Sequence, residues 1–303
     1  MTVASEPPVR QSHGLIHFTD GSLAYAGHYL HEHSHPDHTH SFLEIAVMTG
    51  GAGVHRSATG RHRLHVGDVV LLRPGVWHGY EQCHALDLYN CCFSTDLLHR
   101  ELGWTRDDPL LGYLLWTGPY AMDRRGMITA TLDVATLHEC VRHLDALHRT
   151  HAAAAAERHR ADIIGHLSLF LGCLARAVSI DQAVPPADIV PLHPAVSHTM
   201  HLLETDLARR WTLQELAATL HLTPSYLVRL FRSSTGLPPI AYLSRHRVEA
   251  AATMLLHSDA TITQIARSVG WPDPNHFARR FRSHYGLSAS EYRARFGRTG
   301  AGS

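Results

Sequence analysis

Four side chains in the first third of this 303-residue sequence have the types and spacing of a binding site. His38, His40 and Glu44 form the pattern HxHxxxE, and His78 ends the later segment GDVVLLRPGVWH. Imidazole nitrogens and carboxylate oxygens bind borderline divalent metal ions, and the same atoms hydrogen-bond polar organic molecules. The pattern therefore predicts a site for a metal ion or for a small polar ligand.

A second group of chemically active side chains lies on two similar segments near the end of the chain, TPSYLVRLFRSSTG (223–236) and DPNHFARRFRSHY (273–285). In the second segment Phe277 and Phe281 share one helix face, because they are four residues apart. The polar residues fall on another face. The first segment repeats this division, with Leu227, Leu230 and Phe231 expected to point inward and Ser225, Arg229 and Arg232 outward.

An amphipathic helix of this kind can enter the major groove of DNA, where an arginine fork pairs with guanine and an asparagine amide pairs with adenine. Arg229 and Arg279 are the expected base readers, and other side chains hold phosphate without reading sequence. The predicted DNA contacts are bases for Ser225, Val228, Arg229, Asn275 and Arg279, and phosphates for Arg232, His276 and Arg282.

Each arginine-bearing segment follows an apolar helical segment, LQELAATLH (213–221) or ITQIARSVG (262–270). A capping residue with proline after it begins both later helices, at Thr223–Pro224 and Asp273–Pro274, and Gly270 supplies a turn. The sequence therefore predicts two helix-turn-helix units. A long helix over 241–258 is expected to connect them.

The pattern over about residues 193–296 resembles the AraC/XylS family of transcriptional regulators, including the connecting helix and the closing segment GLSASEYRARF (286–296). The chain has Ser288–Ala289 where the family usually has Ser-Pro. The resemblance implies two recognition helices in successive major grooves, about 34 Å apart. It also implies promoter or operator DNA, a small effector, RNA polymerase and a second copy of the chain as partners.

From residue 15 to about residue 93, short apolar runs alternate with glycine and proline turns, which predicts a small antiparallel β-barrel or sandwich. Alternation is expected to turn His38, His40 and Glu44 inward together. The four histidines before them (His28, His31, His33 and His35) are expected in a solvated loop. The segment resembles the cupin fold, which also implies an effector-binding domain of the AraC type, so the fold class expected is α+β.

The remaining stretches complete the expected organisation. Apolar spacing over about 132–178 predicts a hairpin of two helices, and the family resemblance implies a dimer interface there. Packing of the same stripe on the barrel is the equally open alternative. Residues 1–14 are expected to be a flexible arm and residues 181–192, which are rich in proline, a linker. The expected domains are residues 15–180, for effector binding, and residues 193–298, for DNA binding.

Charge supports a nucleic-acid partner at one end of the chain only. The formal net charge is zero, yet residues 192–298 contain 13 of the 27 arginines and seven acidic residues, a net +6, against −6 for residues 1–191. A basic end on an acidic body is typical of proteins that present one end to phosphate. Five cysteines without a pairing pattern, no signal-like start and no run of about 18 apolar residues favour a reduced, cytoplasmic protein without a membrane span.

These patterns together predict a sequence-specific, DNA-binding transcriptional regulator, not an enzyme. A sugar is the favoured effector class, because LDLYNCCF resembles sugar-responsive members of the family. The alternative is a metal-sensing regulator that holds zinc, iron or nickel with His38, His40, Glu44 and His78. A cupin-type, metal-dependent oxygenase using the same four residues is the remaining rival. Activation and repression both stay open.

Overall fold

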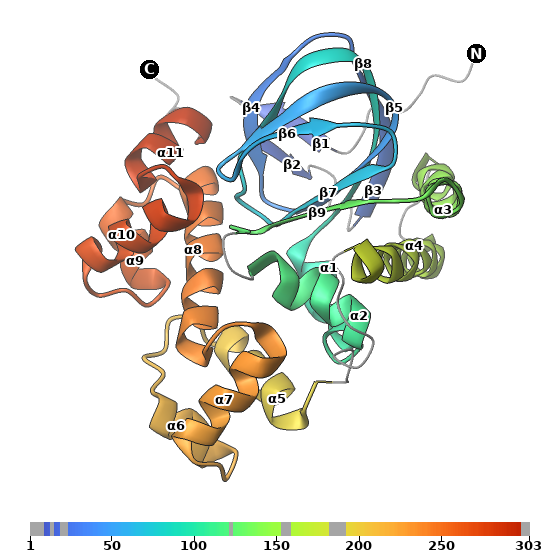
Figure 1. Cartoon of the computed structure of the whole chain (residues 1–303). Coiled ribbons are helices and arrows are strands. Elements are labelled where there is room, and N and C mark those ends of the chain that lie inside the picture. Colours follow the sequence, from blue (N-terminus) through green and yellow to red (C-terminus); the bar gives the residue numbers. More distant parts are fainter. Residues whose placement is uncertain are drawn as a thin grey trace.

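The computed structural model describes residues 9–12, 15–18, 24–120, 124–152, 159–181 and 192–297. Antiparallel strands form a barrel-like sheet, and helices flank it on two sides (Figure 1). The hairpin α3–α4 lies on one side and α8–α11 on the other, with α5–α7 next to α1 and α2. The predicted α+β class is confirmed.

The described residues form nine strands, and these strands make up one sheet. Its order is β1-β2-β4-β8-β5-β7-β9, with β3 paired to β8 and β6 to β5. All pairs are antiparallel except β2 with β4. The strands are β1 Val9–Ser12, β2 Leu15–Phe18, β3 Ala24–His31, β4 His35–His40, β5 Leu43–Ser57, β6 Gly60–Leu64, β7 Asp68–Leu72, β8 His78–Phe93 and β9 Met127–Thr131.

Two sequence predictions about the ends of the barrel differ from the structure. Residues 9–12, expected in a flexible arm, form β1 because they pair antiparallel with β2; the rest of that arm lies outside the described residues. His28, His31 and His35, expected in a solvated loop, lie on β3 and β4. The expected linker falls almost wholly on residues that the structure does not describe.

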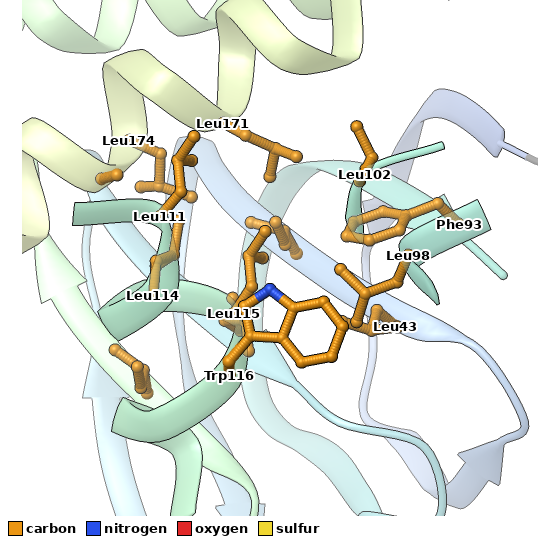
Figure 2. Packing of buried hydrophobic residues seen from close by; sticks show 14 of the residues in the cluster. Leu43, Phe93, Leu98, Leu102, Leu111, Leu114, Leu115, Trp116, Leu171 and Leu174 are labelled. Atoms are coloured by element: carbon orange, nitrogen blue, oxygen red, sulfur yellow. The ribbon is translucent and has the colours of Figure 1, made fainter. Parts of the chain in front are cut away.

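A compact helical segment between β8 and β9 had no counterpart in the sequence prediction. Ser94 and Asp108 cap its helices with their side chains. Trp116 is fully buried among leucines of this segment and of α4 (Figure 2). The segment consists of α1 Thr95–Arg100, η1 Gly103–Arg106, α2 Pro109–Gly112, η2 Tyr113–Thr117 and η3 Gly118–Tyr120.

The two predicted hairpin helices are present as α3 Val134–Ala152 and α4 Arg160–Asp181. Leu144, Leu167 and Phe170 are fully buried, and the helices contact each other, β3 and β9. The window Arg160–Val178 is long and apolar enough to cross a membrane, contrary to the sequence expectation, and 44% of it is buried. Packing of α4 against α3 and β9 accounts for the buried part of this apolar surface.

The C-terminal helices reproduce the two predicted units. Capping boxes begin α6, α9 and α11, and the box at Ser288 with Glu291 fixes the turn where the sequence lacks proline. The helices are α5 Pro194–Thr205, α6 Leu213–Thr219, α7 Pro224–Thr235, α8 Pro239–His257, α9 Ile262–Ser268, α10 Pro274–Tyr285 and α11 Ala289–Phe296.

Two hydrophobic clusters hold the molecule together, and each contains one helix-turn-helix unit. The first joins one part of the barrel and the hairpin to buried residues of α5–α7, such as Leu227 and Phe231. The second joins another part of the barrel, including Val76, to Phe277, Phe281 and other residues of α8–α11. Each unit therefore packs on a different region of the N-terminal half.

Candidate nucleic-acid interface and effector pocket

The helices α7 and α10 are built alike, residue by residue. Each has twelve residues, begins with proline after a capping side chain and ends at a glycine with a φ of 75°. Phe231 and Phe281 occupy the same position and are fully buried. Arg229 and Arg279 also occupy matching positions, and both side chains are exposed. The repeat thus presents the same arginine twice.

Six of the eight predicted DNA contacts are exposed, namely Ser225, Arg229, Arg232, Asn275, Arg279 and Arg282. Val228 and His276 are half-buried. The ring of His276 accepts a hydrogen bond from Arg280 at 3.2 Å, so it is engaged within its own helix. Sequence reasoning did not single out Tyr226, an exposed ring over which the Arg229 guanidinium lies at 5.3 Å. Tyr226 could have been found in the sequence from its position, one helical turn before Arg229.

Arg247 of α8 fixes the two units relative to each other. Its guanidinium donates to the carbonyls of Leu207 at 2.7 Å, Arg209 at 2.8 Å and Gly270 at 2.9 Å. The first two acceptors precede α6, and the third is the turn after α9. Gly270 has a φ of 91°, and a Cβ atom there would lie 2.5 Å from Arg247. A glycine is therefore required at this turn.

Inside the barrel, three of the four predicted pocket residues converge. His40, Glu44 and His78, here called the pocket trio, offer ligand atoms that all lie within 4.8 Å of one another. Glu44 Oε2 is 3.7 Å from His40 Nε2, and Glu44 Oε1 is 3.5 Å from His78 Nε2. All three side chains are at least 97% buried. Glu44 is the second residue of β5, beyond a bend at residues 41–42, so it does not continue the strand of His40 as alternation had suggested.

His38 lies beside the trio and is not part of it. Its ring is 4.2 Å from that of His78, and the two residues are paired across β4 and β8. Its Nδ1 donates to the carbonyl of Pro36 at 3.0 Å. The predicted set of four is thus a set of three with one adjoining imidazole.

One hydrogen bond of the trio fixes the tautomer of the His40 ring. His40 Nδ1 donates to the carbonyl of Phe42 at 2.7 Å, which places the lone pair of the neutral ring on Nε2. His40 Nε2, Glu44 Oε1 and His78 Nε2 have no hydrogen-bond partner among the described residues. A buried group left in this state costs about 1 to 3 kcal/mol. These atoms therefore favour a polar or cationic occupant.

Burial also keeps these imidazoles neutral. Burial lowers the pKa of His40 to about 4, and it lowers the pKa values of His38 and His78 well below 6.5. Neutral imidazole is the form that binds a metal ion.

Further aromatic side chains extend the pocket toward the surface. His55 is fully buried, and its ring lies 5.7 Å from the rings of His78 and Tyr80. Tyr80 in turn lines an open hollow of about 520 Å³ together with His35 and Arg56. Sequence reasoning missed His55 and Tyr80; inward alternation in GVHRS was the signal for His55.

The donor set of the trio fits a divalent metal ion. Zinc–ligand distances of about 2.0 to 2.2 Å in tetrahedral geometry put ligand atoms about 3.3 to 3.6 Å apart. The separations of 3.7 and 3.5 Å at Glu44 each involve a different carboxylate oxygen, and the ligand atoms of the trio lie within 4.8 Å of one another, so binding of one ion requires a small approach of the three side chains. The hydrogen bond from His40 Nδ1 to a carbonyl is the outer-shell contact that orients metal-bound imidazoles.

Comparison with known proteins gives two family matches. Residues 21–170 match an AraC-like ligand binding domain, and residues 216–295 match a helix-turn-helix domain. Among curated proteins, the HTH-type transcriptional activator RhaR of Yersinia pestis is 26% identical over 267 residues, covering 86% of this chain and 85% of that protein. The lactose operon transcription activator of Staphylococcus xylosus is 34% identical over 101 residues, covering 33% of this chain and 36% of that protein.

Among solved structures, a 1.65 Å structure of ToxT from Vibrio cholerae has a TM-score of 0.50 and 13% identity, covering 91% of this chain and 99% of that one. This likeness shows a shared fold.

Proposed function

Since the chain belongs to the AraC family of transcriptional regulators, we propose that α7 and α10 read an operator and that the pocket trio binds the effector. Binding of DNA by the helix-turn-helix units follows from the family, and the individual contacts are our proposal. The observation that carries them is the matched exposure of Arg229 and Arg279 at one position of two equivalent helices.

Arg279 and Arg282 lie on the same helix, but they reach different parts of the DNA. Arg279 lies nearer the start of α10, and recognition helices contact base edges mainly through their N-terminal part. Arg282 lies one turn later, where a guanidinium holds phosphate. Asn275, in the first turn, completes the base-reading surface with Ser225 and Val228 of α7.

Mobility-shift titrations of the full chain on a duplex selected from a random library test this assignment. Arg279→Ala should weaken specific binding by about 1 to 3 kcal/mol and relax one base pair, whereas Arg282→Ala should weaken all duplexes and lower the salt slope by about one. Arg160→Ala, at the exposed start of α4 and paired with Glu101 outside the C-terminal helices, is the matched control. Equal losses on specific and scrambled duplexes for Arg279→Ala contradict the assignment.

Two effector classes suit the pocket, a sugar and a divalent metal ion. The curated relatives favour a sugar, since one of them is named for the lactose operon. The unpaired acceptor atoms of the trio favour zinc, iron or nickel, held by His40, Glu44 and His78 with His38 beside them. Elemental analysis of untagged protein distinguishes the two: stoichiometric metal that Glu44→Gln removes supports the ion, and metal-free protein that binds a sugar by calorimetry supports the sugar.

The remaining assignments complete the proposal. The chain acts in the cytoplasm as a homodimer, with RNA polymerase as its partner at the promoter, and performs no catalysis. Residues 15–180 form the effector-binding domain and residues 193–298 the DNA-binding domain. Exposed apolar side chains on the hairpin, Val134 at 70% and Leu169 at 56% exposure, support a dimer contact there.

A further inference from the structure

The five residues between β7 and β8, Arg73 to Trp77, form what we call the docking loop, because four of them contact the C-terminal half directly. Arg73 pairs with Glu249 of α8 at 3.0 Å. The other three contacts are hydrogen bonds: Tyr285 Oη donates to the carbonyl of Pro74 at 3.3 Å, Tyr292 Oη to that of Gly75 at 2.7 Å, and Trp77 Nε1 to that of Tyr285 at 2.8 Å.

This loop is also bound to the pocket trio. His78 follows Trp77 directly in the chain, and the amide of Gly75 donates to the carbonyl of His40 at 2.8 Å. Two of the three pocket residues are therefore attached to the loop, one by a peptide bond and one by a hydrogen bond.

Strand β4 also contacts the C-terminal half, through residues next to its pocket histidines. Thr39 lies between His38 and His40, and its hydroxyl is 3.2 Å from Tyr292 Oη. Asp37 precedes His38, has a nearly buried carboxylate, and pairs with Arg295 of α11 and with Arg56 at 2.6 Å. The chain neighbours of the pocket histidines thus face α11.

The hydroxyl of Tyr292 joins two separate segments of the barrel. It accepts from Thr39 of β4 and donates to the carbonyl of Gly75 in the docking loop. Since hydrogen bonds weaken steeply with distance and angle, a displacement of β4 relative to the loop weakens one of the two. Tyr292 is fully buried, so water does not replace the lost partner without cost.

The fit around Gly75 leaves little freedom for compensation. Gly75 has a φ of 82°, and a Cβ atom there would lie 2.6 Å from Tyr285 Oη and 2.8 Å from Ala252 of α8. Val76 belongs to the same hydrophobic cluster as Phe281 and Tyr285. A shift of the loop is therefore passed on to α10, because packed cores transmit strain.

The docked face of α10 is not its reading face. Tyr285 and Phe281 are buried, while Asn275, Arg279 and Arg282 stay exposed. Docking thus leaves the DNA contacts free and sets where α10 points relative to the barrel.

We infer that the docking loop and Tyr292 transmit occupancy of the pocket trio to the second helix-turn-helix unit, whose orientation they set. This inference rests on the proposed function and adds the regulation of the same site. A ligand that draws His40, Glu44 and His78 together moves β4 relative to the loop, and Tyr292 converts that movement into a shift of α10 and α11. An operator that contains one site for α7 and one for α10 is bound with an affinity that depends on this orientation. Helices already held in the binding geometry lose less entropy when the protein binds DNA.

A double-mutant cycle on the full chain tests the inference. Glu44→Gln changes the pocket without changing its volume, and Tyr292→Phe removes only the bridging hydroxyl. We expect Glu44→Gln to change the affinity for the selected duplex by about threefold or more when Tyr292 is present, and to have little effect in the Tyr292→Phe background. Tyr89→Phe, which removes a hydroxyl that donates to Asp145 of α3, is the matched control and should leave the effect of Glu44→Gln intact.

Hydrogen exchange of α11 gives a second measurement that needs no DNA. Glu44→Gln should speed exchange of α11 amides in the chain with Tyr292, and Thr39→Val, which removes the other half of the bridge, should do the same. Equal effects of Glu44→Gln in both Tyr292 backgrounds, or no effect in either, overturn the inference. A wild-type chain that selects no duplex instead contradicts the proposed function, and the exchange measurement then decides the inference alone.

Discussion

Replacement of Glu249 by glutamine should destabilise the protein far more than removal of any surface carboxylate. Glu249 is 6% exposed and Arg73 2%, and their charged atoms lie 3.0 and 3.2 Å apart. Tyr120 Oη also donates to this carboxylate. In Glu249→Gln the Arg73 guanidinium stays buried, with the carbonyl of Leu115 at 3.2 Å as its other acceptor.

The expected loss follows from that buried charge. At 3.0 Å and an effective dielectric constant of 20, the attraction between the charges is about 5 kcal/mol, part of which a glutamine oxygen retains as a hydrogen bond. Breaking a buried pair by neutralising one partner costs about 3 to 5 kcal/mol. We expect about 3 kcal/mol, a large share of the 5 to 15 kcal/mol typical of folded proteins.

Urea unfolding followed by circular dichroism measures this loss. Glu101→Gln, which removes the partner of exposed Arg160, is the control and should cost at most about 1 kcal/mol. Arg73→Met combined with Glu249→Leu should recover much of the loss, because it removes both charges. A midpoint shift for Glu249→Gln no larger than that of Glu101→Gln refutes the reasoning.

Three further outcomes are expected. Burial, followed by Arg245 and Arg125, lowers the pKa of His284 to about 3, so between pH 6.5 and 3 the unfolded chain binds a proton that the folded chain does not. Stability should therefore fall by about 1.4 kcal/mol per pH unit below 6.5 on account of this residue, and His284→Gln should reduce the slope of the unfolding free energy against pH, measured by urea titrations, by that amount. His221 occupies in the first unit the turn position of Gly270 in the second and has a φ of 55°, so His221→Gly should raise the unfolding free energy by about 0.5 to 1 kcal/mol; an unchanged or lower midpoint contradicts the assigned strain. Residues 190–303 alone should fold and bind DNA more weakly than the full chain, and an unfolded spectrum by circular dichroism argues against an independent domain.

Local patterns were sufficient to predict the recognition helices. Caps at Thr223 and Asp273, proline at the first helical position and apolar residues four apart are all signals within one helix, and the structure has each of them. The barrel strands followed from alternation between glycine turns. The helical segment over 95–120 was missed because its pieces have three to six residues, too short to show a period of 3.6.

The pocket was only partly predictable from sequence. The pattern HxHxxxE correctly predicted that His40 and Glu44 lie close together. The prediction assumed one continuous strand, whereas the chain bends between the two residues. His55 and Tyr80 join the pocket from β5 and β8, where they are paired across the sheet. Register between strands decides such neighbours, and register depends on contacts that no single strand contains.

The docking loop shows most clearly what lay beyond the sequence. The letters RPG at 73–75 predict a turn, and an arginine in a turn is normally solvated. Here Arg73 is 2% exposed because Glu249, 176 residues later, lies against it, and Tyr292 reaches Gly75 across 217 residues. A buried arginine within a turn has to be paired by something outside that turn, since an isolated buried charge is too costly to keep. Its burial is therefore the physical sign that the barrel is packed against α8, the helix that connects the two helix-turn-helix units.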